Sequence, residues 1–215
     1  GLMDVQAVIV PGVGVAAAQA RIDGTGQNQA LIYRELERGT APERILDLLR
    51  QDSTIDQRQF GIVDRNGRVA GFSGSANGSA SLHRGGRVPG TDLYYSIQGN
   101  LLASDAVVEY AVAAFLAEDG ALEDRVIAAM EAGDTAGGDR RCSCQTRPVP
   151  SAPCETRHAQ VAYLLAADPS DPQGASFNDD RYRLYIDVTA ENILPSENAN
   201  PVVTLRTRYD EMRKR

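Results

Sequence analysis

The chain has 215 residues, of which 42% are hydrophobic, enough to bury one sizeable core. Acidic residues outnumber basic ones by 29 to 22, so the formal net charge is −7 at pH 7. This sign repels phosphate backbones and excludes nucleic acid as the expected partner. No run of apolar residues approaches the ~20 that would span a bilayer, so no membrane span is expected.

The first part of the chain predicts strands, two helices and a hairpin. Residues 5–10 are β-prone, and the small apolar run over 13–20 fits either a strand or a helix. A helix is expected over 27–38, with Gly39 as its stop, and a second helix after Thr40-Ala41-Pro42-Glu43, which has the form of a capping box. Residues 60–63 and 69–72 predict a hairpin around Asn66-Gly67, a pair suited to a tight turn.

The second part predicts a strand, two helices, two further strands and a final helix. A glycine- and serine-rich loop over 73–92 precedes a strand over 94–98 and a helix that begins at Ser104 or Asp105 and is closed by Gly120. A helix over 122–132, closed by Gly133, leads into a cysteine-containing loop over 133–158. Strands are expected over 161–166 and 182–188, and a terminal helix, centred on 202–213, occupies 200–215.

This order of elements indicates the fold class. Helices come in pairs between groups of strands, which favours an α+β protein with helices on both faces of mainly antiparallel sheets. A single alternation of strand and helix would instead have indicated a doubly wound parallel sheet. Nothing in the composition marks an interdomain linker, so residues 1–215 are expected to form a single domain.

Three cysteines, Cys142, Cys144 and Cys154, lie together in a polar loop. This clustering indicates that they bond to one another or to a metal. A disulfide, either Cys144–Cys154 or Cys142–Cys154, is favoured over a zinc set completed by His158, because C-x-C-x9-C-x3-H is not a standard spacing. Neither a metal nor another cofactor is therefore expected. The remaining thiol would be free or would pair with a cysteine outside the chain.

Several other patterns favour ordinary structural interpretations. Gly12 to Ala17 matches a dinucleotide fingerprint, but no second strand with a distal acid follows, so a tight strand turn is favoured. His83 has no acid or nucleophile at a recognisable spacing, so conventional triad chemistry is not supported. A solvated acidic loop is favoured over a calcium site for four aspartates: Asp168, Asp171, Asp179 and Asp180.

Several blocks together resemble one protein family. They are Pro11-Gly12-Val13-Gly14 with Gln19-Ala20, Gly61-Ile62-Val63-Asp64, Gly67-Arg68-Val69-Ala70-Gly71-Phe72-Ser73-Gly74, Gln98-Gly99-Asn100-Leu101-Leu102-Ala103, Ala132-Gly133-Asp134-Thr135-Ala136-Gly137-Gly138-Asp139-Arg140-Arg141, and Tyr185-Ile186-Asp187-Val188. In this order they resemble the DUF1028 family of the N-terminal-nucleophile (Ntn) hydrolase superfamily. The resemblance implies a four-layer αββα sandwich and a hydrolase of unestablished substrate. It also implies export, hence a secreted or periplasmic location.

The resemblance also implies a segment that this sequence does not contain. An Ntn enzyme attacks with a Thr, Ser or Cys at its mature amino terminus and uses its own α-amine as the base, whereas Gly1 has no nucleophilic side chain. We therefore expect that the chain lacks the family's first strand, that the nucleophile lies upstream of Gly1, and that an N-terminal fragment of the same precursor is a partner. A homodimer is the default oligomer.

Polar residues at the predicted strand ends are the candidate site. Asn100 closes a strand and would donate to an oxyanion, or else cap a turn. Asp139 and Arg140 would orient a substrate or nucleophile, or else form a structural ion pair. Gln98 and Arg141 are the expected substrate-binding residues. The favoured function is an Ntn-type amidohydrolase of a small amide or peptide-like substrate, and the alternative is a non-catalytic extracytoplasmic binding or assembly protein.

Overall fold

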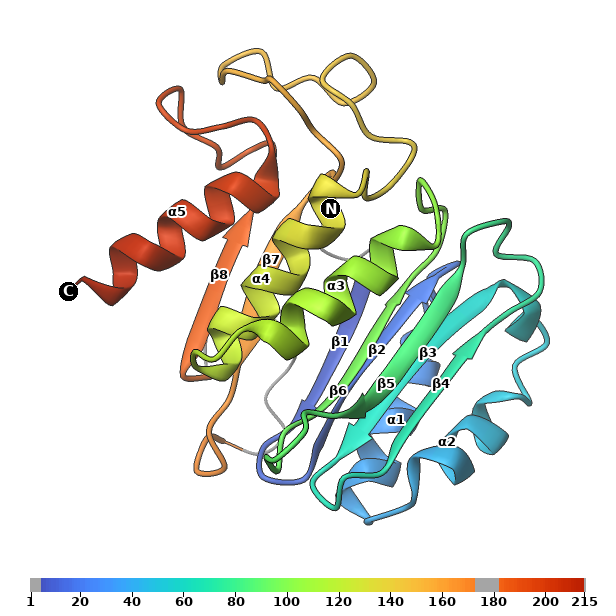
Figure 1. Cartoon of the computed structure of the whole chain (residues 1–215). Coiled ribbons are helices and arrows are strands. Elements are labelled where there is room, and N and C mark those ends of the chain that lie inside the picture. Colours follow the sequence, from blue (N-terminus) through green and yellow to red (C-terminus); the bar gives the residue numbers. More distant parts are fainter. Residues whose placement is uncertain (1–4, 173–181, 215) are drawn as a thin grey trace. The chain divides into compact units, whose positions relative to one another are not determined.

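A computed structural model describes residues 5–172 and 182–214, which contain five α-helices and several small antiparallel sheets (Figure 1). Within this part of the chain, contacts define two compact units. The N-terminal unit comprises residues 5–100, 167–172 and 182–183, and the C-terminal unit comprises 101–166 and 184–214. Each unit is described by itself below.

The N-terminal unit is built on a four-stranded antiparallel sheet. Its strands are β1 (Val5–Val10), β2 (Gly14–Ala20), β3 (Arg58–Asp64) and β4 (Val69–Ser73), in the order β1-β2-β3-β4. The run over 13–20, for which helix and strand were both open, is therefore a strand. The predicted turn at Asn66-Gly67 is confirmed, and Gly67 has the positive φ of 79° that favours glycine.

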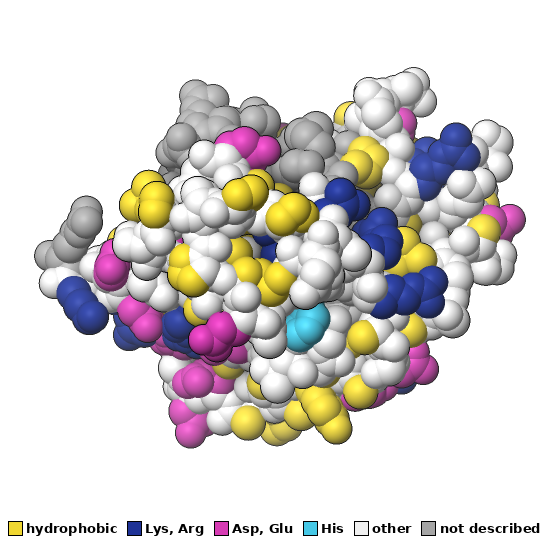
Figure 2. Space-filling view, turned by 90° about the horizontal axis from the view of Figure 1, so that it is seen from above, with side chains coloured by type: hydrophobic (Ala, Val, Ile, Leu, Met, Phe, Trp, Pro, Cys, Tyr) yellow, Lys and Arg dark blue, Asp and Glu magenta, His cyan; other side chains and the backbone are white. Residues whose placement is uncertain are grey.

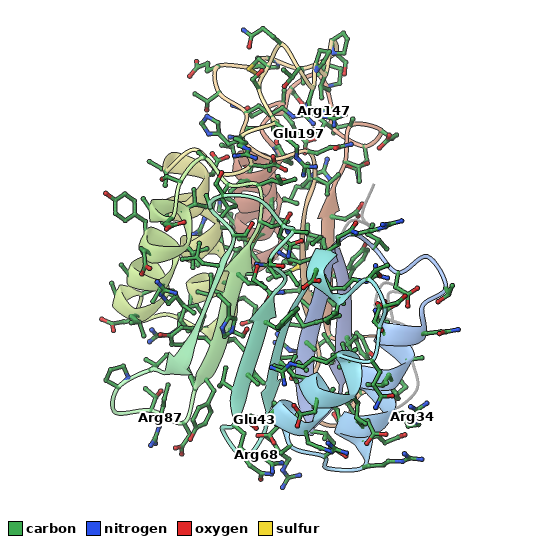
Figure 3. The ribbon with its side chains drawn as sticks, turned by 90° about the vertical axis from the view of Figure 1, so that its right-hand side faces the viewer. Arg34, Glu43, Arg68, Arg87, Arg147 and Glu197 are labelled. Atoms are coloured by element: carbon green, nitrogen blue, oxygen red, sulfur yellow. A yellow bond between two sulfur atoms is a disulfide. The ribbon has the colours of Figure 1, made fainter. Side chains whose placement is uncertain are left out.

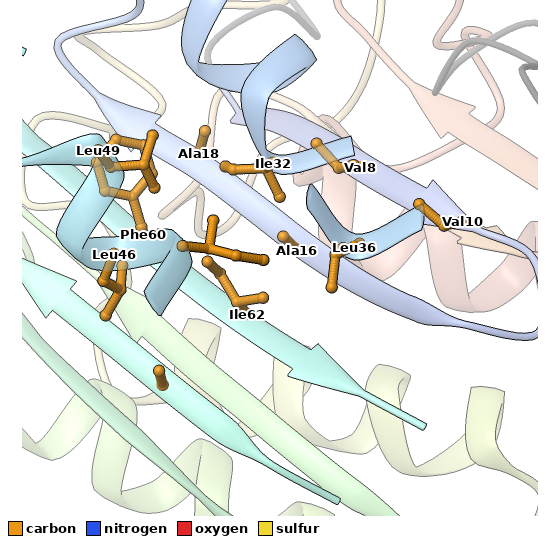
Figure 4. Packing of buried hydrophobic residues seen from close by; sticks show 12 residues of the cluster. Val8, Val10, Ala16, Ala18, Ile32, Leu36, Leu46, Leu49, Phe60 and Ile62 are labelled. Atoms are coloured by element: carbon orange, nitrogen blue, oxygen red, sulfur yellow. The ribbon is translucent and has the colours of Figure 1, made fainter. Parts of the chain in front are cut away.

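Two helices cover one face of this sheet. They are α1 (Gln27–Glu37) and α2 (Pro42–Leu49), and a short 3₁₀ turn, Ile55–Gln57, leads from them into β3. Their apolar side chains pack against those of the sheet (Figure 4). The buried members are Val8, Val10, Ala16, Ala18, Ile32, Leu36, Ile45, Leu46, Leu49, Phe60, Ile62 and Ala70.

The capping box predicted at the start of α2 is wrong. Ala41 is the N-cap and makes no side-chain cap bond. The Thr40 hydroxyl instead donates to Glu35 Oε2 at 2.8 Å, so it links the last turn of α1 to the segment between α1 and α2. Pro42 does occupy the first turn of α2, where its missing N–H has no helical acceptor.

A hairpin forms a second β-layer in this unit. Its strands are β5 (Leu82–Arg87) and β6 (Tyr94–Gly99), and β5 lies inside the stretch that was predicted as a loop over 73–92. That prediction is wrong because glycines and arginines hide the strand pattern. Successive side chains of β3 point to opposite faces, so Phe60 and Ile62 meet the helices while Gly61 meets the hairpin. The N-terminal unit thus has helix, sheet and hairpin layers.

The C-terminal unit packs three helices with a two-stranded sheet. The helices are α3 (Ala106–Ala117), α4 (Leu122–Thr135) and α5 (Pro201–Arg213), and the antiparallel strands are β7 (Ala162–Ala166) and β8 (Leu184–Val188). Their shared core is separate from that of the N-terminal unit. It contains Ile127, Val149, Ala162, Leu164, Leu184, Val188, Ile193, Ala199, Val202, Leu205 and Tyr209.

Gly133 does not end α4 as predicted. It is buried within the helix, facing Val107 of α3, where a Cβ would lie 3.6 Å from the Val107 side chain in ordinary van der Waals contact. The chain leaves the helix at Gly137 and Gly138, which have positive φ angles of 103° and 44°.

The surface carries side chains of every type. On the face seen in Figure 2, basic, acidic and apolar side chains all reach the surface. Among the described helices, none is long and apolar enough to cross a bilayer. Every strand pair in the described sheets is antiparallel, as the order of elements predicted.

Candidate functional site

Asn100 lies at the end of β6, where side-chain amides of the N-terminal unit meet. Its Nδ2 donates to Gln59 Oε1 at 3.1 Å, and Gln19 Nε2 donates to the same oxygen at 2.7 Å. Gln59 is completely buried and donates in turn to the Gly99 carbonyl at 2.8 Å. One hydrogen of the Asn100 amide is therefore used internally.

Gln98 is turned toward the four-stranded sheet. Its Nε2 donates to the Ala17 carbonyl at 3.3 Å, and its Oε1 is buried without a hydrogen-bond partner among the described residues. A Cβ added at Gly61 would lie 2.7 Å from this oxygen. The side chain predicted to bind substrate thus fills the space between hairpin and sheet.

A histidine–serine contact lies in the same layer. His83 Nε2 is 2.8 Å from Ser96 Oγ across the hairpin. Burial, with a smaller contribution from Arg84, lowers the pKa of His83 and favours the neutral imidazole. The two residues are 13 positions apart, a separation that no known sequence signature marks.

Asp139 and Arg141 form an ion pair in the C-terminal unit. The Arg141 guanidinium contacts both carboxylate oxygens, through Nε at 2.9 Å and Nη2 at 2.5 Å. The Arg141 backbone N–H also donates to Asp139 Oδ1, which fixes the turn. The sequence had paired Asp139 with Arg140, whereas in the structure Asp139 forms an ion pair with its second neighbour, Arg141.

A short backbone ladder holds this segment in place. Leu102 pairs with Asp139, the Ala103 N–H donates to Gly138, and the Arg140 N–H donates to Leu101. Leu101 follows Asn100 in the chain. The candidate residues nevertheless divide between the units: Gln98 and Asn100 belong to the N-terminal unit, and Asp139, Arg140 and Arg141 belong to the C-terminal unit.

The predicted disulfide joins Cys144 to Cys154, and Cys142 is a buried free thiol. The alternative pairing of Cys142 with Cys154 is therefore wrong. Burial, assisted by the Asp139 charge, raises the pKa of the Cys142 thiol and favours its protonated form. Within the described residues, no three histidine, cysteine or acidic side chains are grouped as metal ligands, so the zinc set with His158 is not formed.

Arg157 anchors the cysteine loop from within. It is 2% exposed and donates to three carbonyls: that of Ala159 through Nε at 3.1 Å, that of Arg147 through Nη1 at 2.6 Å and that of Gln160 through Nη2 at 2.9 Å. Arg147 itself is exposed and lies in the loop region at the top of Figure 3. The sequence did not identify Arg157, because nothing in the order of residues distinguishes one buried arginine from several others in the same loop.

Two remaining sequence motifs are placed as follows. Gly12 to Ala17 forms the turn between β1 and β2 and the first half of β2, so the favoured tight turn is confirmed. Asp171 Oδ2 accepts the Asp168 N–H at 2.9 Å, and Asp168 pairs with Arg183 at 3.0 Å. Asp179 and Asp180 lie outside the described residues.

Comparison with known proteins identifies the family. Residues 3–152 match the model of DUF1028, a family of unknown function. A crystal structure of protein SPO2555 from Silicibacter pomeroyi, described as DUF1028, is similar to 93% of this chain and 72% of its own, with a TM-score of 0.64 and 22% sequence identity. No curated protein matches significantly. Because the family model covers more than half of its residues, the chain belongs to the DUF1028 family.

Proposed function

We propose that this protein is an Ntn-type amidohydrolase that acts on a small amide or peptide-like substrate. The observation that carries the proposal is the Asn100 amide, which ends a strand of the second β-layer with one hydrogen held by Gln59. A fixed amide donor at such a place is the kind of group that stabilises an oxyanion in acyl transfer. The DUF1028 model itself assigns no activity.

The proposal includes the four-layer αββα sandwich. The helix, sheet and hairpin layers of the N-terminal unit supply three layers in the required order. The similarity to SPO2555 over 93% of the chain supports a shared fold.

The nucleophile is proposed to be a Thr, Ser or Cys upstream of Gly1, with its α-amine as the base. Among the described strands, β1 pairs only with β2, and a further strand is proposed at its other edge, although the Ala7 and Ile9 carbonyls of β1 already accept from Gln29 Nε2 and the Tyr182 hydroxyl. An N-terminal fragment of the same precursor is the proposed partner at this edge. A homodimer is proposed as the assembly on the general prevalence of two-fold symmetry.

The other candidate residues are given positioning roles. In the C-terminal unit, Arg141 would contact a substrate and Asp139 with Arg140 would orient it, since an arginine fork matches a carboxylate. Gln98, whose side chain fills the space between hairpin and sheet, would act only by supporting the strand that carries Asn100. The disulfide supports an extracytoplasmic location, because such bonds persist in oxidising compartments.

The alternative proposal is a non-catalytic extracytoplasmic binding or assembly protein on the same fold. It is favoured by the bond from Asn100 to Gln59, which explains Asn100 as the structural partner of a buried amide. The two proposals differ in what Asn100 does with its second hydrogen.

Two matched variants separate them. Asn100→Ala and Gln19→Ala each remove one donor to Gln59 Oε1, at 3.1 and 2.7 Å. With a panel of small amides and the native mature protein, the enzyme proposal predicts a loss of kcat of about a hundredfold for Asn100→Ala alone. Equal effects of both variants, each following its loss of stability, would support a structural role. No hydrolysis by the native protein across the panel would favour the binding protein.

A further inference from the structure

The C-terminal unit contains an aspartate and a histidine whose buried polar atoms face each other. Asp134 lies in the last turn of α4, and its Oδ1 is 3.6 Å from His158 Nδ1. Neither atom has a hydrogen-bond partner among the described residues, and both are buried. Because buried polar atoms are costly when unpaired, each is the natural partner of the other.

The groups around this pair hold it in one orientation. Asn200 Nδ2 donates to the other carboxylate oxygen of Asp134 at 2.7 Å, while Asn200 Oδ1 caps α5 by accepting the Val202 N–H at 3.1 Å. The Asp139 N–H donates to the His158 carbonyl at 2.8 Å. A Cβ at Gly138 would lie 2.9 Å from His158 Cβ, so glycine permits this close approach.

The outer edge of the imidazole reaches solvent. The His158 side chain is 32% exposed although Nδ1 is buried, so the exposed part lies on the side of the ring that carries Nε2. The cysteine-containing loop over 133–158 contains four arginines against two aspartates and one glutamate, in a chain of net charge −7. Of these arginines, Arg140, Arg141 and Arg147 are exposed. This local charge attracts anions.

We propose that Asp134 and His158 form an acid–base dyad that acts on an anionic acyl compound. The carboxylate holds the proton on Nδ1, leaves the lone pair on Nε2 and stabilises the imidazolium when Nε2 takes up a proton or an acyl group. Asn200 is a positioning residue that orients the carboxylate. The inference goes beyond the proposed amidohydrolase, because it uses only residues of this unit and no nucleophile upstream of Gly1.

The tautomer of His158 tests the dyad directly. The chain has only two histidines, so ¹⁵N-histidine labelling gives two imidazoles, and His83 is assigned by its own substitution. The proposal predicts Nδ1–H for His158. In Asp134→Asn, Asn200 still donates to the side-chain oxygen, so the new NH₂ group faces Nδ1 and shifts the proton to Nε2. Glu131→Gln is the matched control, since Glu131 lies on the same helix and pairs with Arg206.

Reactivity provides the second readout, with 4-nitrophenyl succinate as an anionic probe and 4-nitrophenyl acetate as its neutral counterpart. The Nε2 lone pair forms a bond to the acyl carbon, the ester C–O bond breaks, nitrophenolate leaves with the electron pair, and water then hydrolyses the acyl-imidazole. Because the succinate carboxylate also attacks its own ester carbonyl and releases nitrophenolate without protein, every rate is the protein-dependent release after subtraction of the release in buffer alone. This protein-dependent rate is expected to be higher for the succinate than for the acetate. The succinate rate should fall about a hundredfold in Asp134→Asn and His158→Gln and stay unchanged in Glu131→Gln.

Three results would overturn the dyad: an Nε2–H tautomer in the native protein, an unchanged tautomer in Asp134→Asn, or nitrophenolate release that survives His158→Gln. A faster reaction of the acetate would overturn the anionic substrate class. If Asp134→Asn does not fold, the native tautomer and the His158→Gln rate still decide. A purely structural contact would lower stability in Asp134→Asn without changing nitrophenolate release per folded molecule.

Discussion

Gly61 of β3 and Gly71 of β4 are register partners, and the β5–β6 hairpin occupies the space that their missing side chains leave. A Cβ at Gly61 would clash with Ser96 Oγ, and a Cβ at Gly71 would clash with the His83 ring. The two glycines therefore let polar hairpin side chains pack directly on the backbone of the sheet. This close approach keeps Gln59 and Asn100 in reach of each other.

Gly61→Ala should destabilise the protein. The added methyl group must displace Ser96 and Gln98, and overpacking of this kind costs about 1–3 kcal/mol. Urea denaturation measures the change in the free energy of unfolding. Gly24→Ala is the control, because a Cβ at Gly24 has no atom within 4 Å and the variant should be near wild type. Equal stability of the two variants would contradict close packing of the hairpin.

Asp52 should contribute stability that is lost in acid. Burial raises the pKa of this carboxyl, but hydrogen bonds from Asn28, Thr54 and Arg58 outweigh burial and hold the pKa well below its usual value of 3.8. Because the folded-state pKa lies below the unfolded one, the stabilisation is complete above about pH 5 and decreases as the pH falls further. Chemical denaturation between pH 7 and pH 2 measures it.

Asp52→Asn should lower the free energy of unfolding at pH 7 by on the order of 3 kcal/mol, since it leaves the buried Arg58 charge without its partner. The variant should also show a flatter loss of stability in acid. Asp47→Asn is the matched control, because Asp47 is half exposed and pairs with the exposed Arg50, an arrangement worth about 0–1 kcal/mol. A wild-type acid profile in Asp52→Asn would refute this role.

Arg157→Lys should loosen the cysteine loop. A lysine ammonium cannot reproduce the planar fork that reaches three carbonyls from one position. Hydrogen exchange over residues 139–160 should become faster, and stability should fall by about 3 kcal/mol, as for other losses of buried charged networks. Arg147→Lys, an exposed change on the same loop, should leave exchange unaltered. Unchanged protection in Arg157→Lys would show that the disulfide alone holds the loop.

Only one thiol per chain should become alkylated, and only after unfolding. Cys144 and Cys154 are bonded, and burial raises the pKa of Cys142. Intact mass after iodoacetamide at pH 7.5 should show no adduct on the native protein and one on the unfolded, unreduced protein. The double variant with serine at 144 and 154 should lose about 3 kcal/mol, because the bond closes a loop with a sequence separation of 10. Rapid native alkylation would contradict the buried position of Cys142.

The sequence predicted the elements whose patterns are local. The apolar stripes of α1 and α2, the Asn66-Gly67 turn and the clustered cysteines each follow from neighbouring residues, and the structure confirms them. Strand β5 was missed because its glycines replace the side chains that mark a strand. Gly133 was misread as a stop, because α4 continues through it to Thr135 and the chain leaves the helix at Gly137 and Gly138, which have positive φ.

The candidate site could be predicted only in part for the same reason. Asn100 and Asp139 stand in distinctive motifs, but the partner of Asn100 is Gln59, 41 residues away. The contact of Asp134 with His158 likewise spans a long loop, and no sequence motif relates two residues at this separation. Tertiary packing, rather than sequence distance, decides which polar groups meet.

The identity of the first residue of the mature native protein tests the proposed amidohydrolase most directly. Amino-terminal sequencing with intact mass, followed by replacement of that residue with alanine, is the measurement. The proposal predicts Thr, Ser or Cys at this position and loss of amide hydrolysis in a variant that still folds. A mature chain that begins with any other residue, or hydrolysis that persists in the alanine variant, would contradict it.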